Sequence, residues 1–498
     1  MKQQLLPIMF VGTCSDAGKT VINAAFCRIF KQDGYRPAPF KAQNMSLNSY
    51  STAEGGEMGR AQVVQAEACG IAPHTDMNPI LLKPTNDKNS QVVLNGKPIG
   101  NMSAKDYFGK QNEKEALFEE AIQSFNRLSE RYNPIVLEGA GSISEINLRD
   151  RDITNMRMAI KAKASTYLIA DIDRGGVFGS VYGTIALLRP EERARMKGII
   201  INKFRGDASL FDDGKKMLED LCGIPVVGVI PWFRDIKIEE EDSVALDMKN
   251  NTYKEGKINV AIILLKRMSN FTDFDVLEMD DRFNPYYTNN LEEIRKADII
   301  LLPGSKNTLL DLQGLRANGI ANEIVRAFKN GKKVIGICGG YQMMGARIED
   351  PDHIEGNIQA VPGLGLLPQR TVIEQEKVTK QSHFAFLASS DETVCKGYEI
   401  HMGRTELIGE APTQPVARLE DGRLDGYYLN DRCWGSYLHG ILDNPSVLDQ
   451  LAKGFETDAP QAPFDYAAFK EEQYDKLADL VREHVNMEYI YESMKTDA

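Results

Sequence analysis

A glycine-bounded loop close to the start of the sequence has the residue types of a phosphate-binding site. Residues 12–20 read Gly-Thr-Cys-Ser-Asp-Ala-Gly-Lys-Thr. Backbone N–H groups of such a loop point at a phosphate, with a helix N-terminus behind them. Lys19 would then reach the outer phosphates of a nucleotide, and Thr20 would bind a magnesium ion. Five residues separate Gly12 from Gly18, one more than in the common motif, so the spacing alone also fits an ordinary loop.

Polar side chains also follow several apolar runs that read as strands. Lys41 would hold a phosphate or a substrate carboxylate. Glu138 takes the position where a carboxylate commonly helps to bind the magnesium of a nucleotide. The amide of Asn202 would read a purine base. Each residue alone also fits a turn or a solvated loop, but ligands of parallel sheets bind beyond the carboxyl ends of the strands. The predicted nucleotide-binding residues are Gly12, Thr13, Asp16, Gly18, Lys19, Thr20, Lys41 and Asn202.

A second motif predicts a thiol nucleophile. Cys338 stands between Gly336-Ile337 and Gly339-Gly340, at the end of an apolar run. This pattern is typical of a nucleophile on a strand-to-helix turn, where the strained backbone leaves no room for side chains. A helix N-terminus behind the sulfur would favour the thiolate. The alternative is an inert buried thiol, which the local sequence disfavours.

A thiol nucleophile needs a base, and the sequence contains six histidines. His439 is the first candidate because it ends a predicted strand and precedes a glycine. His401 is the second, and either residue alone also fits a structural histidine. Backbone N–H groups that would stabilise an oxyanion are expected at Gly304, in a turn after another strand, and at Gly339.

Two α/β units are needed to position these residues. Short apolar runs alternate with helical stretches over residues 1–235, which predicts a mostly parallel sheet with helices on both faces. A polar, acidic, solvated linker is expected over residues 236–256, and a second strand-rich domain over 257–445. Apolar residues at helical spacing, among them Tyr474, Leu477 and Val481, predict a helical tail over residues 446–498.

Composition narrows the class of protein. A chain of 498 residues is too long for one core, so two or three domains are expected. The formal charge of −12, without a basic run, argues against nucleic acid as a partner. No apolar run is long enough to span a bilayer, and no signal peptide fits before the loop. Seven scattered cysteines without a C-x-x-C pair favour a reducing cytoplasm and no structural zinc.

On these motifs the chain resembles the cobyric acid synthase family, the glutamine-hydrolysing amidases of cobalamin biosynthesis. The first half is similar to dethiobiotin synthetase-like phosphate-loop proteins through residues 12–20, Lys41 and residues 138–141. The second half is similar to class I glutamine amidotransferases through residues 336–340 and 438–440. The implied fold is α/β, with two doubly wound, mostly parallel sheet domains and a helical C-terminal tail. The segments most specific to the family are residues 41–48, 78–84, 138–147 and 398–403.

The resemblance implies one reaction that the two halves share. ATP would phosphorylate carboxylates of adenosylcobyrinic acid a,c-diamide, and ammonia from glutamine would convert four of them to the amides of adenosylcobyric acid. Cys338 would attack the glutamine amide while His439 carries the proton. Ammonia must cross between the domains before protonation traps it, which implies an enclosed path. The implied metal contacts for Mg²⁺ are Thr20 and Glu138, followed by Glu57 and Glu145.

One position departs from the class I amidotransferases, which usually place a glutamate two residues after the catalytic histidine. Here that residue is Ile441, and cobyric acid and cobyrinic acid diamide synthases also lack the glutamate. Either another acid orients His439 or the glutaminase is intrinsically slower. Glu399 is the predicted replacement.

Three alternatives stay open at this point. The sister enzyme, cobyrinic acid a,c-diamide synthase, amidates two other carboxylates, and residues 41–48 and 78–84 argue against it. A regulatory phosphate-loop ATPase would not need Cys338 or a second α/β domain. A glutaminase-like binding module would retain the fold without thiol reactivity. The sequence does not determine the oligomeric state.

Overall fold

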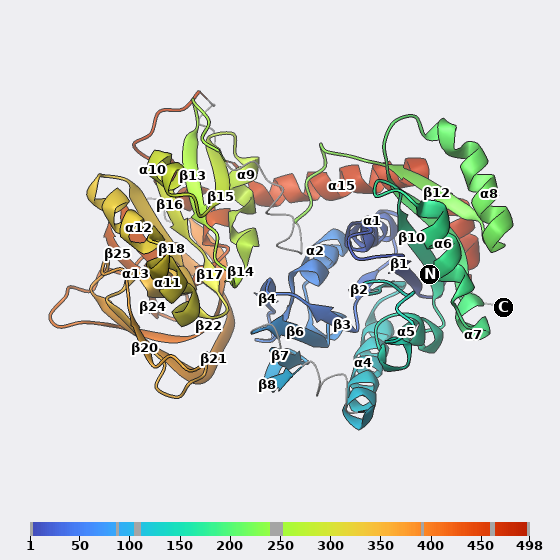
Figure 1. Cartoon of the computed structure of the whole chain (residues 1–498), viewed down its shortest axis with the longest axis horizontal. Coiled ribbons are helices and arrows are strands. Elements are labelled where there is room, and N and C mark those ends of the chain that lie inside the picture. The colour runs from blue at the N-terminus through green and yellow to red at the C-terminus, as the bar shows by residue number, and fades with distance from the viewer. Residues whose placement is uncertain are drawn as a thin grey trace.

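The computed structural model describes residues 3–85, 89–103, 111–239, 252–389, 393–458 and 464–495. These residues form two lobes, one for each half of the chain, as Figure 1 shows. Each lobe is built on a six-stranded sheet. Among the helices of the described ranges, none combines the length and the apolar character that a membrane span requires.

The first lobe has a fully parallel sheet with β1 (Ile8–Gly12) near its centre. The strand order is β12-β11-β10-β1-β9-β2, and all neighbouring strands run parallel. The other strands are β2 (Ala38–Phe40), β9 (Ile135–Glu138), β10 (Ser165–Asp171), β11 (Met196–Phe204) and β12 (Val226–Pro231). The central strands are apolar and buried along their whole length, because helices cover both faces of the sheet. The mostly parallel sheet predicted for this half is confirmed.

Helices occupy the connections between these strands. They are α1 (Lys19–Gln32), α2 (Arg60–Cys69), α4 (Gln111–Arg131), α5 (Met156–Lys161), α6 (Val177–Ala186), α7 (Pro190–Arg193) and α8 (Asp212–Cys222). In α1, Ile22, Phe26 and Ile29 recur at helical spacing and are buried against the sheet. Because α1 begins where the glycine-bounded loop ends, its N-terminus faces that loop.

A small β-rich insertion between β2 and β9 faces the second lobe. It contains a four-stranded sheet of β3 (Gln43–Met45), β6 (Ile80–Pro84), β7 (Asn89–Leu94) and β8 (Lys97–Ser103). It also contains a two-stranded ribbon of β4 (Ser49–Ser51) and β5 (Glu57–Gly59). In Figure 1 the insertion lies at the junction of the lobes, and β4 contacts two strands of the second lobe.

The second lobe has a mostly parallel sheet in the order β15-β13-β16-β18-β26-β25. Only β25 and β26 pair antiparallel within it. The strands are β13 (Ile258–Ile263), β15 (Phe283–Thr288), β16 (Ile299–Leu302), β18 (Lys333–Ile337), β25 (Tyr427–Asn430) and β26 (Cys433–Ser436). The helices are α9 (Asp275–Met279), α10 (Leu291–Lys296), α11 (Thr308–Ala317), α12 (Ile320–Lys329) and α13 (Gly339–Met344). This architecture agrees with the predicted second α/β domain.

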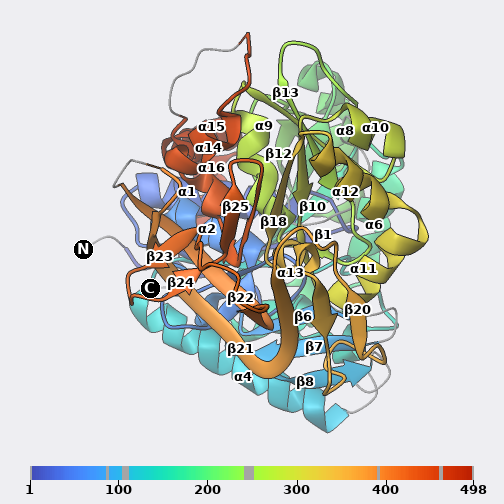
Figure 2. The same cartoon turned by 90° about the vertical axis from the view of Figure 1, so that its left-hand side faces the viewer.

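A second, largely antiparallel sheet in this lobe was not predicted. Its long hairpin of β21 (Gln369–Phe386) and β22 (Val394–Leu407) crosses the lower half of Figure 2. The remaining strands are β19 (Arg347–Glu349), β20 (Ala360–Pro362), β23 (Ala417–Leu419), β24 (Leu424–Asp425) and β27 (Leu438–His439). A separate pair, β14 (Met268–Ser269) and β17 (Gly304–Ser305), lies near the main sheet. Many hairpin residues are exposed and charged, which hides the strand pattern in the sequence.

The predicted helical tail is present and joins the two lobes. It consists of α14 (Pro445–Ala452), α15 (Tyr466–His484) and α16 (Met487–Ser493). Tyr466, at the start of α15, packs into the core of the second lobe, whereas Leu477 and Val481 pack with α1 in the first. Figure 1 shows α15 running from one lobe to the other.

The predicted linker over residues 236–256 lies partly outside the described residues, which end at Glu239 and resume at residue 252. The linker was expected to be solvated throughout, but Glu239 is not, because it forms a buried ion pair. Its oxygens accept two hydrogen bonds from Arg60, at 2.6 and 2.9 Å. Burial alone would raise the pKa of Glu239, but Arg60 and Lys470 lower it to about 2. This end of the linker is therefore fixed by a buried ion pair.

Candidate functional site

The glycine-bounded loop surrounds the side chain of Lys19. Its Nζ donates hydrogen bonds to the carbonyl oxygens of Cys14, at 3.0 Å, and Gly141, at 2.9 Å. Gly12 leaves room for this side chain, because a Cβ atom there would lie 2.8 Å from Nζ. Gly18 has φ +94°, and a Cβ atom on it would lie 2.2 Å from a side chain of β11. Both glycines are therefore required by the shape of the loop.

Three more of the predicted nucleotide-binding residues lie around the same loop. Asn202 is the β11 residue beside Gly18, and its Nδ2 donates to the carbonyl oxygen of Ala17 at 2.9 Å. Asp16 has a left-handed φ of 57°, and its carboxylate lies 3.1 Å from Arg174. Thr13 is buried directly after β1. The structure thus brings these residues together at the carboxyl ends of neighbouring strands.

A buried ion cluster centred on Glu138 adjoins the loop. Glu138 Oε1 accepts hydrogen bonds from Thr20 Oγ1 and Lys41 Nζ, both at 2.8 Å. Its Oε2 accepts one from Gln65 Nε2 at 2.6 Å. Burial alone would raise the pKa of Glu138, but Lys41, Gln65 and Thr20 lower it, so the carboxylate is charged. The hydroxyl and the carboxylate form an oxygen donor set of the kind that Mg²⁺ prefers.

The two other predicted metal ligands do not join this cluster. Within the described residues, no three acidic, histidine or cysteine side chains form a group that could hold a metal ion. Glu57 accepts hydrogen bonds from Lys83, at 2.6 Å, and from Lys377 of the second lobe. Burial would raise the pKa of Glu57, but these lysines hold it far below its usual range. Glu57 therefore joins the lobes instead of facing the loop, and the metal assignment of exposed Glu145 stays a prediction.

Cys338 lies on a sharp turn between β18 and α13. Its backbone has φ 50° and ψ −108°, and a positive φ is uncommon for any residue except glycine. A Cβ atom on Gly340 would lie 2.0 Å from the carbonyl oxygen of Leu302, and one on Gly336 would lie 2.7 Å from that of Gly340. These glycines let the helix pack directly against the strands. The turn therefore has the geometry expected of a nucleophile elbow.

His439 lies beside Cys338 and is held by an acid that the sequence did not predict. Asp273 Oδ2 lies 2.7 Å from His439 Nδ1, and the nitrogen donates because an ionised carboxylate only accepts. Burial alone would lower the pKa of His439, but Asp273 and the sulfur of Cys338 raise it to about 10. An imidazolium beside the sulfur favours the thiolate, which is the nucleophilic form of cysteine.

Glu399, the predicted orienting acid, faces away from His439, so that hypothesis is wrong. Side chains alternate between the faces of β22. Tyr398 stacks on His439 with ring centroids 5.3 Å apart, whereas the next residue, Glu399, pairs with Arg423 at 2.7 Å. His401 is two residues after Glu399, so its side chain lies on the same face of β22, 3.5 Å from the Glu399 carboxylate. The second candidate base thus belongs to the opposite face.

The two predicted oxyanion glycines flank the thiol site. A Cβ atom on Gly304 would lie 3.4 Å from His439 Cε1, and one on Gly339 would lie 2.8 Å from the backbone nitrogen of Ser305. Gly339 is the first residue of α13, so its N–H has no acceptor within that helix. The structure brings both glycines to the site, and their role as oxyanion donors stays a prediction.

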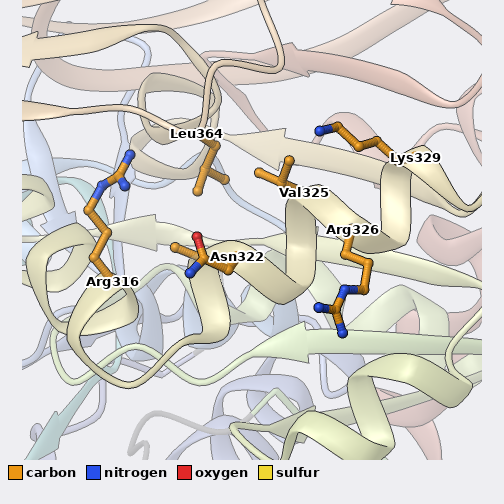
Figure 3. A pocket seen from close by; sticks show the side chains of 7 residues that line it. Arg316, Asn322, Val325, Arg326, Lys329 and Leu364 are labelled. Atoms are coloured by element: carbon orange, nitrogen blue, oxygen red, sulfur yellow. The ribbon is translucent and has the colours of Figure 1, made fainter.

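A surface hollow of about 420 Å³ on the second lobe is separate from these groups. It lies between α11, α12 and Leu364, as Figure 3 shows. It is lined by Arg316, Ala321, Asn322, Val325, Arg326, Lys329 and Leu364. None of these side chains was predicted to do chemistry.

Asp273, Gln65 and Lys377 are the site residues that sequence reasoning missed. Asp273 follows β13 and β14, at the same sheet edge where the other strands deliver functional groups. The same reasoning about strand ends applies to the second half of the chain, but the aromatic stretch around Asp273 carries none of the motifs considered in the sequence. Gln65 lies inside a helix and Lys377 on the long hairpin, where no local pattern marks them.

Known proteins show the same two-part organisation. A family model described as the CobQ/CobB/MinD/ParA nucleotide binding domain matches residues 8–245, and one described as the CobB/CobQ-like glutamine amidotransferase domain matches residues 259–447. A cobyric acid synthase of Parabacteroides distasonis is 84% identical over 99% of this chain and 100% of that protein. Those of Bacteroides fragilis and Phocaeicola vulgatus are 61% and 59% identical, over 99% of both chains in each comparison. The chain therefore belongs to the cobyric acid synthase family.

Proposed function

We propose that the chain amidates four carboxylates of adenosylcobyrinic acid a,c-diamide to give adenosylcobyric acid, using ATP, Mg²⁺ and glutamine. Membership of the family supports a glutamine-dependent ligase that acts on a corrinoid. The proposal includes the division into residues 1–235, 236–256, 257–445 and 446–498. It also places the enzyme in the cytoplasm, where the seven free cysteines would stay reduced.

The first lobe would activate the carboxylate. A carboxylate oxygen is a poor leaving group, so the γ-phosphoryl group of ATP would first be transferred to the substrate carboxylate to give an acyl phosphate. Ammonia would then attack the acyl carbon and displace inorganic phosphate, which leaves the amide. Lys19 would contact the transferring group, and Lys41 would hold the phosphate or the carboxylate. Thr20 and Glu138 would bind Mg²⁺, which when bound supplies positive charge to the phosphates.

The second lobe would release ammonia from glutamine. The Cys338 thiolate would attack the amide carbon, and the N–H groups of Gly304 and Gly339 would stabilise the resulting oxyanion. His439 would protonate the leaving nitrogen and then take a proton from the water that hydrolyses the thioester. The products of this step are ammonia and glutamate.

The observation that supports this function most directly is that a single short segment of the chain contacts both sites. Lys41 hydrogen-bonds Glu138, and Ser49 hydrogen-bonds Asn270 and Tyr398 beside the thiol site. The chain between Lys41 and Ser49 can span at most about 28 Å between Cα atoms. Ammonia would therefore have a short path between the lobes, as a reaction that must avoid its protonation requires.

Mass spectrometry of the corrinoid product tests the proposal. Incubation with a cobyrinic acid a,c-diamide, ATP, magnesium and glutamine should add four amides. If the protein instead adds two amides to the corrinoid that lacks the a and c amides, it is the sister enzyme. Cys338→Ser should abolish amidation with glutamine but leave amidation with ammonium salts intact. Loss of both reactions in folded Cys338→Ser would contradict the proposed division of labour.

A further inference from the structure

We propose that Asp273 is the positioning residue of the glutaminase, and that Asn48 and Ser49 of the first lobe hold the segment that carries it. The inference rests on the proposed role of Cys338 and His439 in glutamine hydrolysis. Asp273 would take the role of the glutamate that class I amidotransferases usually have at the position of Ile441. This arrangement also makes the geometry of the thiol site depend on contact between the lobes.

The carboxylate of Asp273 holds His439 in two ways. Its Oδ2 accepts from His439 Nδ1 at 2.7 Å, and its Oδ1 accepts from the backbone N–H of Gly440 at 2.9 Å. The side chains of Asp273 and His439 are only 3% and 2% exposed. Two hydrogen bonds to adjacent residues fix both the direction of the carboxylate and the rotation of the imidazole ring. With Nδ1 donating to Asp273, Nε2 is the nitrogen left to exchange a proton with Cys338.

The segment around Asp273 is held by the first lobe. Asp273 lies in a short 3-10 helix, Phe271–Phe274, and the preceding Asn270 has a left-handed φ of 53°. Asn270 and Ser49 exchange two hydrogen bonds, at 2.9 and 3.2 Å. Asn48 Oδ1 accepts a third, from the backbone N–H of Phe271 at 3.1 Å. A strained residue persists where its surroundings determine it, and here those surroundings belong to the other lobe.

Ser49 of the first lobe also supports His439 through Tyr398. The Tyr398 ring stacks on the imidazole, with the rings inclined by 24°. Its hydroxyl lies 3.3 Å from the carbonyl oxygen of Ser49 and 3.2 Å from Asn270 Nδ2. Ser49 therefore supports both the acid and the ring that confine His439. A shift of the segment that begins at Lys41 would disturb both supports together.

Other charged groups near His439 do not replace Asp273. Cys338 is the reacting partner, and Tyr398 is a phenol whose pKa burial raises well above its usual value. Asp443 lies close to Gly440, because a Cβ atom on Gly440 would be 3.4 Å from Asp443 Oδ2. Burial raises the pKa of Asp443 to about 7. Asp273 is also the acid that hydrogen-bonds the imidazole.

Asp273→Asn tests the inference, with Glu399→Gln as its matched control. We expect Asp273→Asn to lower the kcat of glutamine hydrolysis at least about 100-fold, the scale of lost acid–base catalysis. Glu399→Gln should leave it within about twofold, because that acid faces away from His439. Both variants should keep amidation with ammonium salts. The pH profile of Cys338 alkylation by iodoacetamide should move to higher pH in Asp273→Asn, since removing the charge lowers the pKa of His439.

Asn48→Ala tests the contribution of the other lobe. It should slow glutamine hydrolysis about 5- to 20-fold, and the double variant with Asp273→Asn should be no slower than Asp273→Asn alone, because the two residues act through one element. The inference would be overturned if Asp273→Asn kept glutaminase activity within twofold of wild type while Cys338→Ser was inactive. The proposed function would then still stand. Loss of the ammonia reaction in Asp273→Asn would also overturn it, because the residue would then support folding. Glutamine-dependent amidation by Cys338→Ser would instead refute the proposed function.

Discussion

The phosphate-loop site and the thiol site are assembled in different ways. Thr20, Lys41 and Gln65, which hydrogen-bond Glu138, all belong to the first lobe. The thiol site has Cys338 and His439 on second-lobe elements, but its supporting residues hydrogen-bond Asn48 and Ser49. The first site is therefore complete within its own lobe, whereas the second is completed by the other.

This difference has a consequence for coupling between the two reactions. Ammonia is lost if glutamine is hydrolysed while no activated carboxylate is present. A thiol site that needs the first lobe for its geometry releases ammonia only when the lobes are engaged. The phosphate-loop site has no such need. Substitutions in the phosphate-loop site should therefore slow amidation from glutamine and from ammonia alike. Substitutions at the interface between the lobes should slow the glutamine-dependent reaction most.

Lys19→Ala should have the largest effect and should break the first site alone. Removing a charge aimed at the transferring phosphoryl group costs about 100- to 1000-fold in kcat. We expect amidation from glutamine and from ammonium salts to fall together by at least this factor. Product mass spectrometry with each nitrogen source measures both. Lys161→Ala, at an exposed position of α5 in the same lobe, is the control, and a selective loss of the glutamine reaction in Lys19→Ala would contradict the comparison.

Glu57→Gln should weaken the contact between the lobes. It leaves Lys83 and Lys377 buried without their carboxylate, and breaking a buried pair costs about 3–5 kcal/mol of stability. Glu374→Gln removes an exposed partner of Arg404 on the same hairpin and should cost about 1 kcal/mol or less. Denaturant unfolding measures both variants. Because the folded-state pKa of Glu57 is lowered, its contribution is present above the ordinary glutamate pKa and is lost as the pH falls below it.

The same variant tests coupling. With the interface weakened, glutamine hydrolysis should slow more than amidation from ammonium salts does. The ratio of the two rates in Glu57→Gln, relative to that in Glu374→Gln, measures this difference. Equal loss of both reactions would mean that the thiol site does not depend on lobe contact more than the phosphate-loop site does.

The sequence predicted the parts of each site that local chemistry determines. The glycines around Lys19 and Cys338 are needed for tight turns, so the motifs reveal them without knowledge of the fold. The acid beside His439 was assigned wrongly to Glu399, because the choice depends on which face of a strand each residue occupies. Glu57 was predicted as a metal contact, and its ion pair with Lys377 was missed because Lys377 is distant in sequence and comes from a hairpin that was not predicted. Contacts between lobes leave no periodic signal in a single sequence.

Gln65→Met should have a smaller effect, restricted to the first site. Gln65 Nε2 donates to the charged Glu138 at 2.6 Å, and a hydrogen bond to a charged group is worth about 1.5–3 kcal/mol. We expect amidation from both nitrogen sources to fall about 10- to 100-fold. Gln32→Met, which removes an exposed hydrogen bond to Asp475 on the neighbouring helix, should change neither. Unchanged amidation in Gln65→Met would show that Lys41 and Thr20 alone fix Glu138.

The pH dependence of stability should distinguish Asp273, which hydrogen-bonds His439, from Glu399, which faces away from it. We expect this to be the smallest of the effects. The pKa of His439 is raised from 6.5 to about 10, so its stabilisation is complete below pH 6.5 and is lost as the pH rises to about 10. For one proton, the free energy of unfolding cannot change by more than about 1.4 kcal/mol per pH unit. The stability advantage of wild type over Asp273→Asn should therefore shrink across this range, as denaturant unfolding at pH 6, 8 and 10 would measure. The pKa of Glu399 is lowered to about 2 by His401 and Arg423 against the effect of burial, so the advantage over Glu399→Gln should stay constant. A constant advantage over Asp273→Asn as well would mean that Asp273 does not hold the imidazolium, and the thiol site would then lose the feature that ties it to the first lobe.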